Sequence, residues 1–395
     1  MKKTIVSATL MAALGLSQQV HAVELDGFLS AGFATHDLED ATYLDTISDD
    51  IRFDNDSKFG LQISADVAEN MQAVAQILGA GSDENFDMDV EWAYIDWSLS
   101  DSISLRGGKV KEPVFLISDY LEVGYAYPWI RPPQEVYRNN PINTINGLQG
   151  LFQADLGNMS LVFQPYLGSN NEAVPNTNGD LVFDASNFYG AAIQLQARAF
   201  TVQMSYLTTD VTTTEVSGVP GAPFTGFQAS GSAELISAGV SWDVNNFIGY
   251  AEYVTRDISG DAVVGVSPAM GAIFPDQDAW YLTVGYRMGK FLPHLTVASS
   301  EATPESAVPE FANQGVSQDS ITLGLRYEVN DSSSLKFEIQ TIEPDLDANS
   351  GGLFGQTAVV LDNTGFPIGG GTPAVGSLTS GDSVTMISAQ LDIIF

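Results

Sequence analysis

The C-terminal end of the chain alternates between apolar and polar side chains and finishes on an aromatic residue. From Ile387 to Phe395 every second side chain is apolar, and Ser388, Gln390 and Asp392 lie between them. A period of two is the pattern of a β-strand with two different faces. Such a strand needs a partner for its free edge, and the first strand of a closed sheet can supply one. The pattern therefore favours a sheet that closes on itself.

The N-terminal segment has the pattern of a secretory signal. Lys2 and Lys3 precede an apolar run over residues 5–16, and small residues flank His21 where a signal peptidase would cut. We expect residues 1–22 to be a cleaved signal peptide and residues 23–395 to form a single domain. The apolar run is too short for a membrane helix, and no later run reaches the roughly 18 apolar residues that one needs.

Charge and composition exclude several classes of protein. The chain has 15 Lys and Arg against 49 Asp and Glu; without Lys2 and Lys3 the balance is 13 against 49, a formal charge of −36. Nucleic acid is therefore not an expected partner. The chain has no cysteine, so disulfides are excluded, and its 44% hydrophobic content is ample for an ordered fold. A salt-adapted surface would account for the loop carboxylates as well as a functional role would.

Alternating segments recur along the chain, and short connections alternate with longer ones. Seven connections are tight, near residues 68–70, 100–101, 157–158, 198–199, 243–246, 289–290 and 330–331. Eight are longer, near residues 37–51, 80–86, 112–147, 169–182, 209–233, 257–278, 300–318 and 343–382. Seven turns and eight loops imply 16 strands, so we predict an all-β fold, a transmembrane antiparallel 16-stranded β-barrel with both termini on the short-turn side.

The two faces of the strands differ as this fold requires. In the segment 280–287, Trp280, Leu282 and Val284 alternate with Tyr281 and Thr283, and other segments show the same phase. Aromatic residues gather near strand ends, as in the interfacial girdles of membrane barrels. A barrel of this size encloses an aqueous channel, so function depends on what narrows it. The long third loop, residues 112–146, is predicted to fold into the lumen.

The signal segment, the rhythm of strands and loops, the long third loop and Phe395 together resemble the Gram-negative outer-membrane porins. The resemblance implies a homotrimer in the outer membrane of a Gram-negative bacterium, lying among lipid and lipopolysaccharide. It also implies assembly by the barrel-assembly machinery, with Phe395 in barrel closure and assembly. Well-known members carry a Pro-Glu-Phe element in the third loop, whereas here Pro309, Glu310 and Phe311 fall in the seventh connection.

Opposed charges across a constriction sort solutes by charge, and the chain offers both signs. The third loop contributes candidate constriction residues of three kinds, the acids Glu112, Asp119, Glu122 and Glu135, the bases Arg131 and Arg138, and the aromatics Tyr120, Tyr125, Tyr127 and Trp129. The candidate bases of the pore wall are Lys58, Arg106, Arg287, Arg326 and Lys336. The aromatics could hold sugar rings or cations, although packing of the loop against the wall is the simpler expectation. For each charge, a solvated rim position or a lumenal salt bridge is the alternative.

These observations predict a water-filled channel for passive diffusion of small hydrophilic solutes and ions, with cation preference from the excess of acids. A substrate-specific porin for sugar, phosphate or organic acid is the alternative, and an outer-membrane hydrolase is a further one. We expect no enzyme, because only His36 and His294 remain after signal cleavage and neither lies in a nucleophile motif. No cofactor or metal site is expected, since the acids Glu84, Asp87, Asp89 and Glu91 do not match a calcium loop.

Overall fold

The fold was analysed in a computed structural model that describes residues 23–39, 41–44, 46–82, 85–173, 181–215, 228–260, 275–303, 316–345, 353–354 and 381–395. The predicted signal segment, residues 1–22, lies outside these ranges. So do Glu84 and the Pro-Glu-Phe element at residues 309–311.

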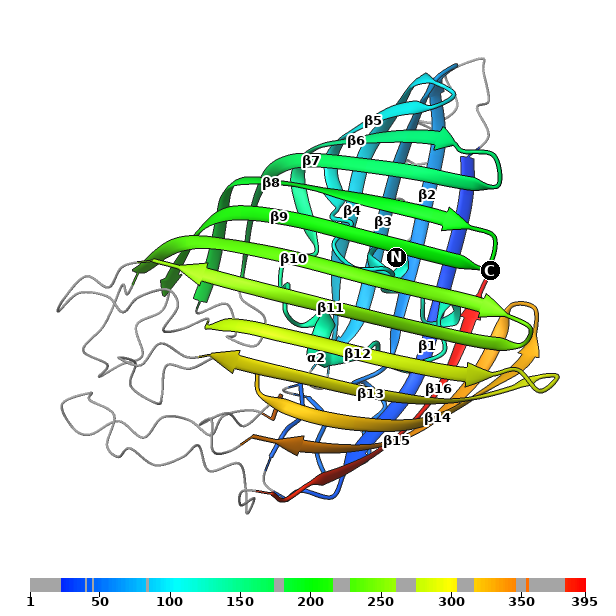
Figure 1. Ribbon diagram of the computed structural model, residues 1–395, viewed down its shortest axis with the longest axis vertical. Coiled ribbons are helices and arrows are strands. Elements are labelled where there is room, and N and C mark those ends of the chain that lie inside the picture. Colours follow the sequence, from blue (N-terminus) through cyan, green and yellow to red (C-terminus); the bar gives the residue numbers. More distant parts are fainter. Residues whose placement is uncertain are drawn as a thin grey trace, which may run out of the picture.

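Sixteen antiparallel strands form one closed barrel, which confirms the predicted fold class (Figure 1). Each strand pairs with its neighbours in sequence, and the last pairs with the first. The strands are β1 (Val23–His36), β2 (Lys58–Ala68), β3 (Met71–Ser82), β4 (Asn85–Ser100), β5 (Ile103–Lys111), β6 (Thr144–Asp155), β7 (Met159–Ala173), β8 (Leu181–Ala197), β9 (Phe200–Glu215), β10 (Gln228–Val244), β11 (Phe247–Ser259), β12 (Asp276–Tyr286), β13 (Phe291–Thr303), β14 (Gln318–Asn330), β15 (Ser333–Pro344) and β16 (Val384–Ile394).

The C-terminal strand closes the barrel against β1, as its alternation predicts. Their register runs from Phe28 opposite Ile394 to His36 opposite Met386. The backbones of Gly27 and Phe395 exchange hydrogen bonds of 2.8 and 2.9 Å. The Phe395 ring lies directly over Gly27, where an added Cβ would come within 2.4 Å of a ring carbon. The absence of a side chain at Gly27 therefore leaves the space that the Phe395 ring occupies on the barrel wall.

The seven short connections lie where the sequence predicts them, but several strands extend further than expected. Arg198, Asn245 and Asn246 adopt positive φ of 51°, 49° and 74° in two of these turns, as tight hairpins require. On the other side, β9 continues through a threonine-rich stretch to residue 215, because β8 and β10 pair with it there and β-branched residues suit an extended backbone. The predicted longer connection at 80–86 is wrong in length: β3 and β4 are separated only by residues 83–84.

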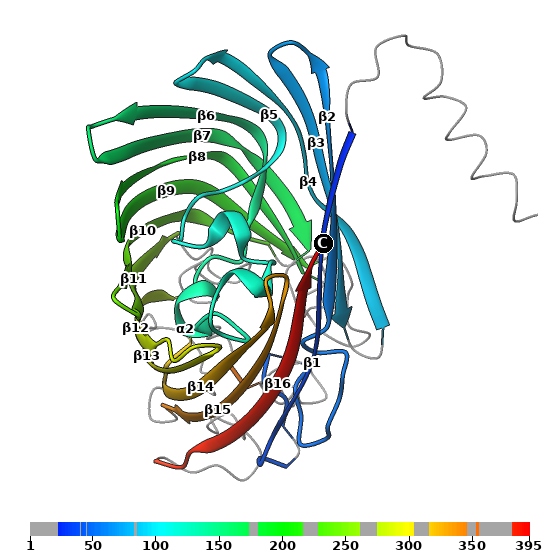
Figure 2. The same cartoon turned by 90° about the vertical axis from the view of Figure 1, so that its right-hand side faces the viewer.

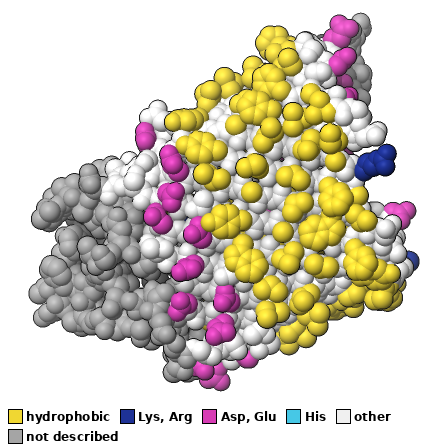
Figure 3. Space-filling model, viewed as in Figure 1, with side chains coloured by type: hydrophobic (Ala, Val, Ile, Leu, Met, Phe, Trp, Pro, Cys, Tyr) yellow, Lys and Arg dark blue, Asp and Glu magenta, His cyan; other side chains and the backbone are white. Residues whose placement is uncertain are grey.

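The outer face of the barrel is apolar, and the inner face is mostly polar. On β12, Trp280, Leu282 and Val284 are 42–43% exposed on the outside, whereas Tyr281 and Thr283 are buried on the inside. Figure 3 shows the outward apolar side chains as a broad band across the strands. Within the described residues, no helix is long and apolar enough to cross a membrane. The alternation read from the sequence therefore gives the correct face for these strands.

A row of outward-facing carboxylates lies between the apolar band and the long-loop side (Figure 3). The acids are exposed and stand opposite one another on paired strands, as Glu234 with Asp257, Asp278 with Glu301, and Asp319 with Glu343. Directly opposed like charges destabilise a sheet modestly. Water and headgroups are required around them, so this row marks the edge of the apolar band.

Candidate pore constriction

The third long connection, residues 112–143, runs inside the ring of strands (Figure 2). It contains three single-turn helices, η2 (Ser118–Tyr120), η3 (Gly124–Ala126) and α2 (Gln134–Tyr137). Prolines at 113, 128, 132, 133 and 141 restrict its backbone and remove donors that would need partners. Without long internal helices, the connection must satisfy its remaining backbone groups on the barrel wall.

Glu252 on β11 is the first anchor of this connection. Its buried carboxylate accepts a hydrogen bond from the backbone N–H of Leu116 at 2.9 Å and from the Tyr281 hydroxyl at 2.7 Å. The Tyr137 hydroxyl donates to the same carboxylate. Both ends of the connection are thus tied to one side chain. Hydrogen bonds to a charged group each contribute about 1.5–3 kcal/mol, so Glu252 is a strong fastening.

Two cations of the wall hold the middle of the connection by its carbonyls. Lys336 on β15 donates to the carbonyls of Gly124 at 2.5 Å and Trp129 at 2.6 Å. Arg326 on β14 donates to those of Tyr125 and Tyr127 at 2.6 and 2.9 Å. These four carbonyls lie within residues 124–129, which contain only the single turn η3 followed by irregular backbone. The wall therefore replaces the hydrogen bonds that secondary structure would have supplied.

The predicted aromatic residues divide into two groups. Tyr127 and Trp129 are each only 1% exposed, and the Trp129 indole N–H lies 3.0 Å from the hydroxyls of both Thr283 and Thr296. They pack against the wall, as the simpler expectation held. Tyr120, in contrast, is 37% exposed. Tyr125 is partly buried, stacks on Arg326 and donates to the carbonyl of Asp331 at a short turn.

Most of the predicted charges are held in pairs or buried. Glu122 lies 3.1 Å from Lys58, Arg131 lies 2.5 Å from Asp56, and Lys336 lies 3.0 Å from Asp392. Glu112 is 2% exposed, and Glu135 is 1% exposed and accepts a hydrogen bond of 2.7 Å from Gln318. Glu122, Arg131 and Lys336 therefore form lumenal salt bridges, and Glu112 and Glu135 are buried.

The pKa values of the loop acids reflect these surroundings. Burial would raise the pKa of Glu122, but the Lys58 ammonium outweighs it and holds that pKa below the usual value. Burial raises the pKa of Glu135, with hydrogen bonds from Ser320 and Gln318 opposing the rise. The pKa values of two carboxylates on the same connection are thus shifted in opposite directions.

Asp119 and Arg106 form the exposed part of the predicted charge set. Asp119 is exposed at the surface of the loop, and Arg106 on β5 is 25% exposed and forms an ion pair of 2.8 Å with Asp96. The Arg106 guanidinium also lies 5.1 Å from the centre of the Tyr94 ring. Surrounding protein atoms raise the pKa of Asp119, and Arg106 and Lys111 partly offset that rise. The two residues are therefore electrostatically coupled across the loop and wall.

Some predicted residues do not join this group. Arg287 lies one residue beyond β12, where its side chain is 44% exposed and pairs with Asp243 at 2.6 Å on the short-turn rim. Arg138 is exposed near the long-loop end of the connection, and Phe395 lies at the barrel seam. A protein-sequence pattern alone gives the phase of a side chain but not its height in the barrel.

Several residues that shape the site are missing from the sequence-based set. Glu252 is the clearest case, since an inward acid on a mid-barrel strand is a visible signal for a loop anchor. Glu91 and Lys111 form an ion pair, and Lys111 also lies near the Trp92 ring. A bulge on β4 opposite Gln76 and Ile77 turns Trp92 inward, so simple alternation assigns it to the wrong face.

The described residues contain no group of three or more His, Cys, Asp and Glu side chains that could hold a metal ion. His36 and His294 are both buried. The His36 Nε2 lies 2.9 Å from the carbonyl of Ile47, and the His294 Nε2 lies 3.9 Å from Glu338.

Comparison with known proteins agrees with this architecture. The family profile of Gram-negative porins matches residues 4–346. Three solved structures share the fold at TM-scores of 0.57, 0.53 and 0.55: an anion-selective porin from Comamonas acidovorans, the trimer form of OmpT from Vibrio cholerae, and Salmonella typhi OmpF in complex with daunomycin.

The sequences of these structures have diverged far from this chain. Their identities to it are 12%, 13% and 12%, over 95% of this chain in each case and 99%, 99% and 98% of theirs. No curated protein sequence matches the chain significantly. The family match covers most of the chain and coincides with a closed barrel of 16 strands. The chain therefore belongs to the Gram-negative porins, the channel proteins of the bacterial outer membrane.

Proposed function

We propose that this porin is a passive, cation-preferring channel for small hydrophilic solutes and ions. The observation that carries the proposal is the pairing of its bases. Of the 13 Lys and Arg that remain when Lys2 and Lys3 are left out, at least nine lie within 3.4 Å of a carboxylate. Each pair is close to neutral, so the exposed acids that border the channel, such as Asp119, set the field there.

The proposed constriction lies between the exposed edge of the third connection and the wall that carries Arg106. Asp119 and Tyr120 form the loop side, and the pair of Glu122 with Lys58 closes one end. Tyr127, Trp129 and Lys336 then act as supports behind the loop. The Debye length is about 8 Å at physiological salt, so a channel of similar width senses an exposed carboxylate without full screening.

Selectivity in this proposal follows from side chains and not from the fold. The Comamonas porin is described as anion-selective and shares 12% identity with this chain. At this low sequence identity, the selectivity of the Comamonas porin is not a guide to the charges that line the channel of this chain. The formal charge of −34 and the paired bases favour cations here.

A substrate-specific channel is the alternative within the same class. Liposome swelling with neutral sugars, phosphate and organic acids of graded size separates the two. A general channel gives rates that fall smoothly with solute size. A substrate-specific channel gives saturation for one solute class, and that result would replace passive general diffusion in the proposal.

Assembly is part of the proposal. We infer a homotrimer whose outer apolar band contacts lipid and neighbouring protomers, with lipopolysaccharide beside the outward carboxylates and the barrel-assembly machinery as the folding partner. The trimer form of the Vibrio cholerae protein supports the oligomeric state. Native mass spectrometry or cross-linking of the detergent-extracted protein tests it, and a monomer in mild detergent contradicts it.

A hydrolase is the candidate from another class. Its one structural support is the His294 imidazole 3.9 Å from Glu338, but this pair lies beneath the third connection, where Glu338 accepts the backbone N–H of Ile130. We propose no enzymatic role. Esterase and peptidase assays on the purified protein are expected to show no turnover. Activity that disappears in His294→Asn would overturn the proposal.

A further inference from the structure

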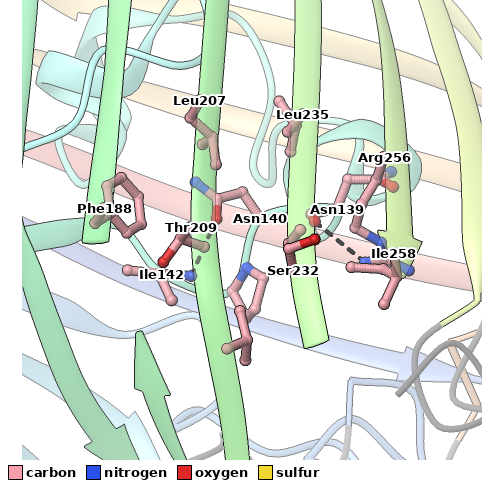
Figure 4. A pocket seen from close by; sticks show the side chains of 13 residues that line it. Asn139, Asn140, Ile142, Phe188, Leu207, Thr209, Ser232, Leu235, Arg256 and Ile258 are labelled. Atoms are coloured by element: carbon pink, nitrogen blue, oxygen red, sulfur yellow. Dashed lines mark hydrogen bonds between the residues drawn. The ribbon is translucent and has the colours of Figure 1, made fainter. Parts of the chain in front are cut away.

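A cavity of about 60 Å³ lies where the third connection returns to the wall (Figure 4). Residues 139–142 form one side, and the inner faces of β8 to β11 form the other. Phe188, Leu207 and Leu235 make most of its lining apolar, and Arg256 stands at its edge. A space of one water corresponds to about 10–15 Å³ on this measure, so the cavity of about 60 Å³ accommodates a group of about four to six heavy atoms.

Arg256 differs from the other wall cations in its partners. It donates to the carbonyls of Asn139 and Pro275 at 3.1 Å each and to the Gln277 amide oxygen at 3.0 Å. All three acceptors are uncharged. Its Nε is buried and has no acceptor, and Arg256 forms no ion pair with any carboxylate of the described chain.

The carboxylate of neighbouring Asp276 is engaged elsewhere. It accepts a hydrogen bond of 2.7 Å from the backbone N–H of Ile258 and lies outward on β12, whereas Arg256 lies inward on β11. Among the described residues, no carboxylate therefore compensates the positive charge of the Arg256 guanidinium, which lies beside an apolar space. A partly buried cation without an anion is costly, and an anion brought beside it relieves that cost.

We propose that this cavity binds a small aliphatic monocarboxylate. The carboxylate lies beside the Arg256 guanidinium, with Nε–H as the donor still without an acceptor. The short hydrocarbon tail lies among Phe188, Leu207 and Leu235. Charge selects an anion, and the size of the cavity selects a tail of about three carbons.

The proposed site is separate from the exposed face formed by Asp119 and Arg106, and it does not depend on the direction of ion selectivity. It lies at the root of the connection, close to the long-loop end of the wall strands. A bound carboxylate would neutralise Arg256 and leave the rest of the channel charge unchanged.

Isothermal titration calorimetry on the folded protein in detergent tests the site, with sodium butyrate as the probe. We expect saturable binding of one butyrate per chain. Butan-1-ol lacks the charge and butylamine has the opposite charge, so neither should bind. In Arg256→Gln the affinity for butyrate should fall at least tenfold, whereas Arg198→Gln at a short turn, the matched control, should bind like the parent.

A second variant is needed because Arg256→Gln also removes the hydrogen bond to the carbonyl of Asn139 and could alter the third connection itself. Ala233 lines the cavity, so Ala233→Leu fills it and leaves the guanidinium in place. Butyrate binding should also be lost in this variant. No saturable heat with the parent protein, or undiminished binding in both variants, would overturn the site. Because binding is measured without transport, such a failure is distinguishable from loss of conductance, which would count against the channel itself.

Discussion

The Nζ of Lys58 on β2 lies 3.1 Å from the carboxylate of Glu122 on the third connection. The two residues are 64 positions apart in sequence. Their side chains are 20% and 19% exposed, so the pair borders the space between loop and wall. This ion pair joins the edge of the loop to the strand next to the barrel seam. The Glu122 carboxylate compensates the positive charge of Lys58, so the pair carries no net charge.

Breaking that pair should change selectivity in a defined direction. In Glu122→Gln the Lys58 charge is uncompensated, so we expect the permeability ratio of potassium to chloride to fall by about twofold. A unit charge about 8 Å away in water contributes about 0.5 kcal/mol, and screening over one Debye length reduces this to about 0.2 kcal/mol. The charge acts with opposite sign on the two ions, so the ratio changes by about twofold. Lys58→Gln is the matched control and should raise the ratio. Equal ratios in both variants and the parent, measured from reversal potentials, would show that the pair lies off the ion path.

Acidification should weaken cation preference through Asp119. Its pKa is raised above the usual aspartate value, mainly because surrounding atoms disfavour the charged form. It therefore gains its proton as pH falls toward that pKa, before an ordinary exposed aspartate does. The potassium-to-chloride permeability ratio should begin to fall in that window. Asp119→Asn should have the lower ratio at neutral pH and lose this step; a step that persists in the variant contradicts the assignment.

Loss of the Glu252 anchor should loosen the third connection. Glu252→Ala leaves the Leu116 N–H and the hydroxyls of Tyr137 and Tyr281 without their shared acceptor. We expect a loss of about 3 kcal/mol or more in stability, since buried donors would be left unsatisfied. The measurement is the midpoint of heat modification on gels, together with open-channel current noise, which should rise. Asp257→Asn, on the outer face of the same strand, should leave the current noise unchanged and should not lower the midpoint, since it only removes a repulsion with Glu234.

Phe395 and Gly27 should show strong coupling in a double-mutant cycle. Gly27→Ala places a methyl about 2.4 Å from the Phe395 ring, so the ring must move and the seam should weaken. Phe395→Ala removes the ring, and in that background Gly27→Ala should cost less. The cycle is read from refolding yield and the heat-modification midpoint. Additive effects of the two substitutions would mean that the ring does not depend on this glycine.

Much of the fold is readable from the sequence, because a two-faced strand has a strict period. The faces of β12 and the closure of β16 on β1 follow from that period alone. Strand ends are less readable, since the threonine-rich end of β9 and the short gap after β3 depend on pairing with neighbours. The bulge near Trp92 also depends on a neighbouring strand.

The site is less readable, because its geometry rests on contacts between residues that are far apart in sequence. The charges of Glu122 and Lys58 are visible in the sequence, but their pairing is not. Lys336 is visible as an inward base, whereas its role as a donor to the carbonyls of Gly124 and Trp129 requires the folded loop. The sequence does not show that Arg256 has only uncharged acceptors; that is seen only in the folded barrel.

The most direct test of the central claim is the zero-current potential of the purified protein in a planar bilayer under a potassium chloride gradient. The excess of acids over paired bases predicts a cation-selective channel, so the dilute side should become positive. Asp119→Asn should reduce the potential. A dilute side that becomes negative would mean anion selectivity and would contradict the account.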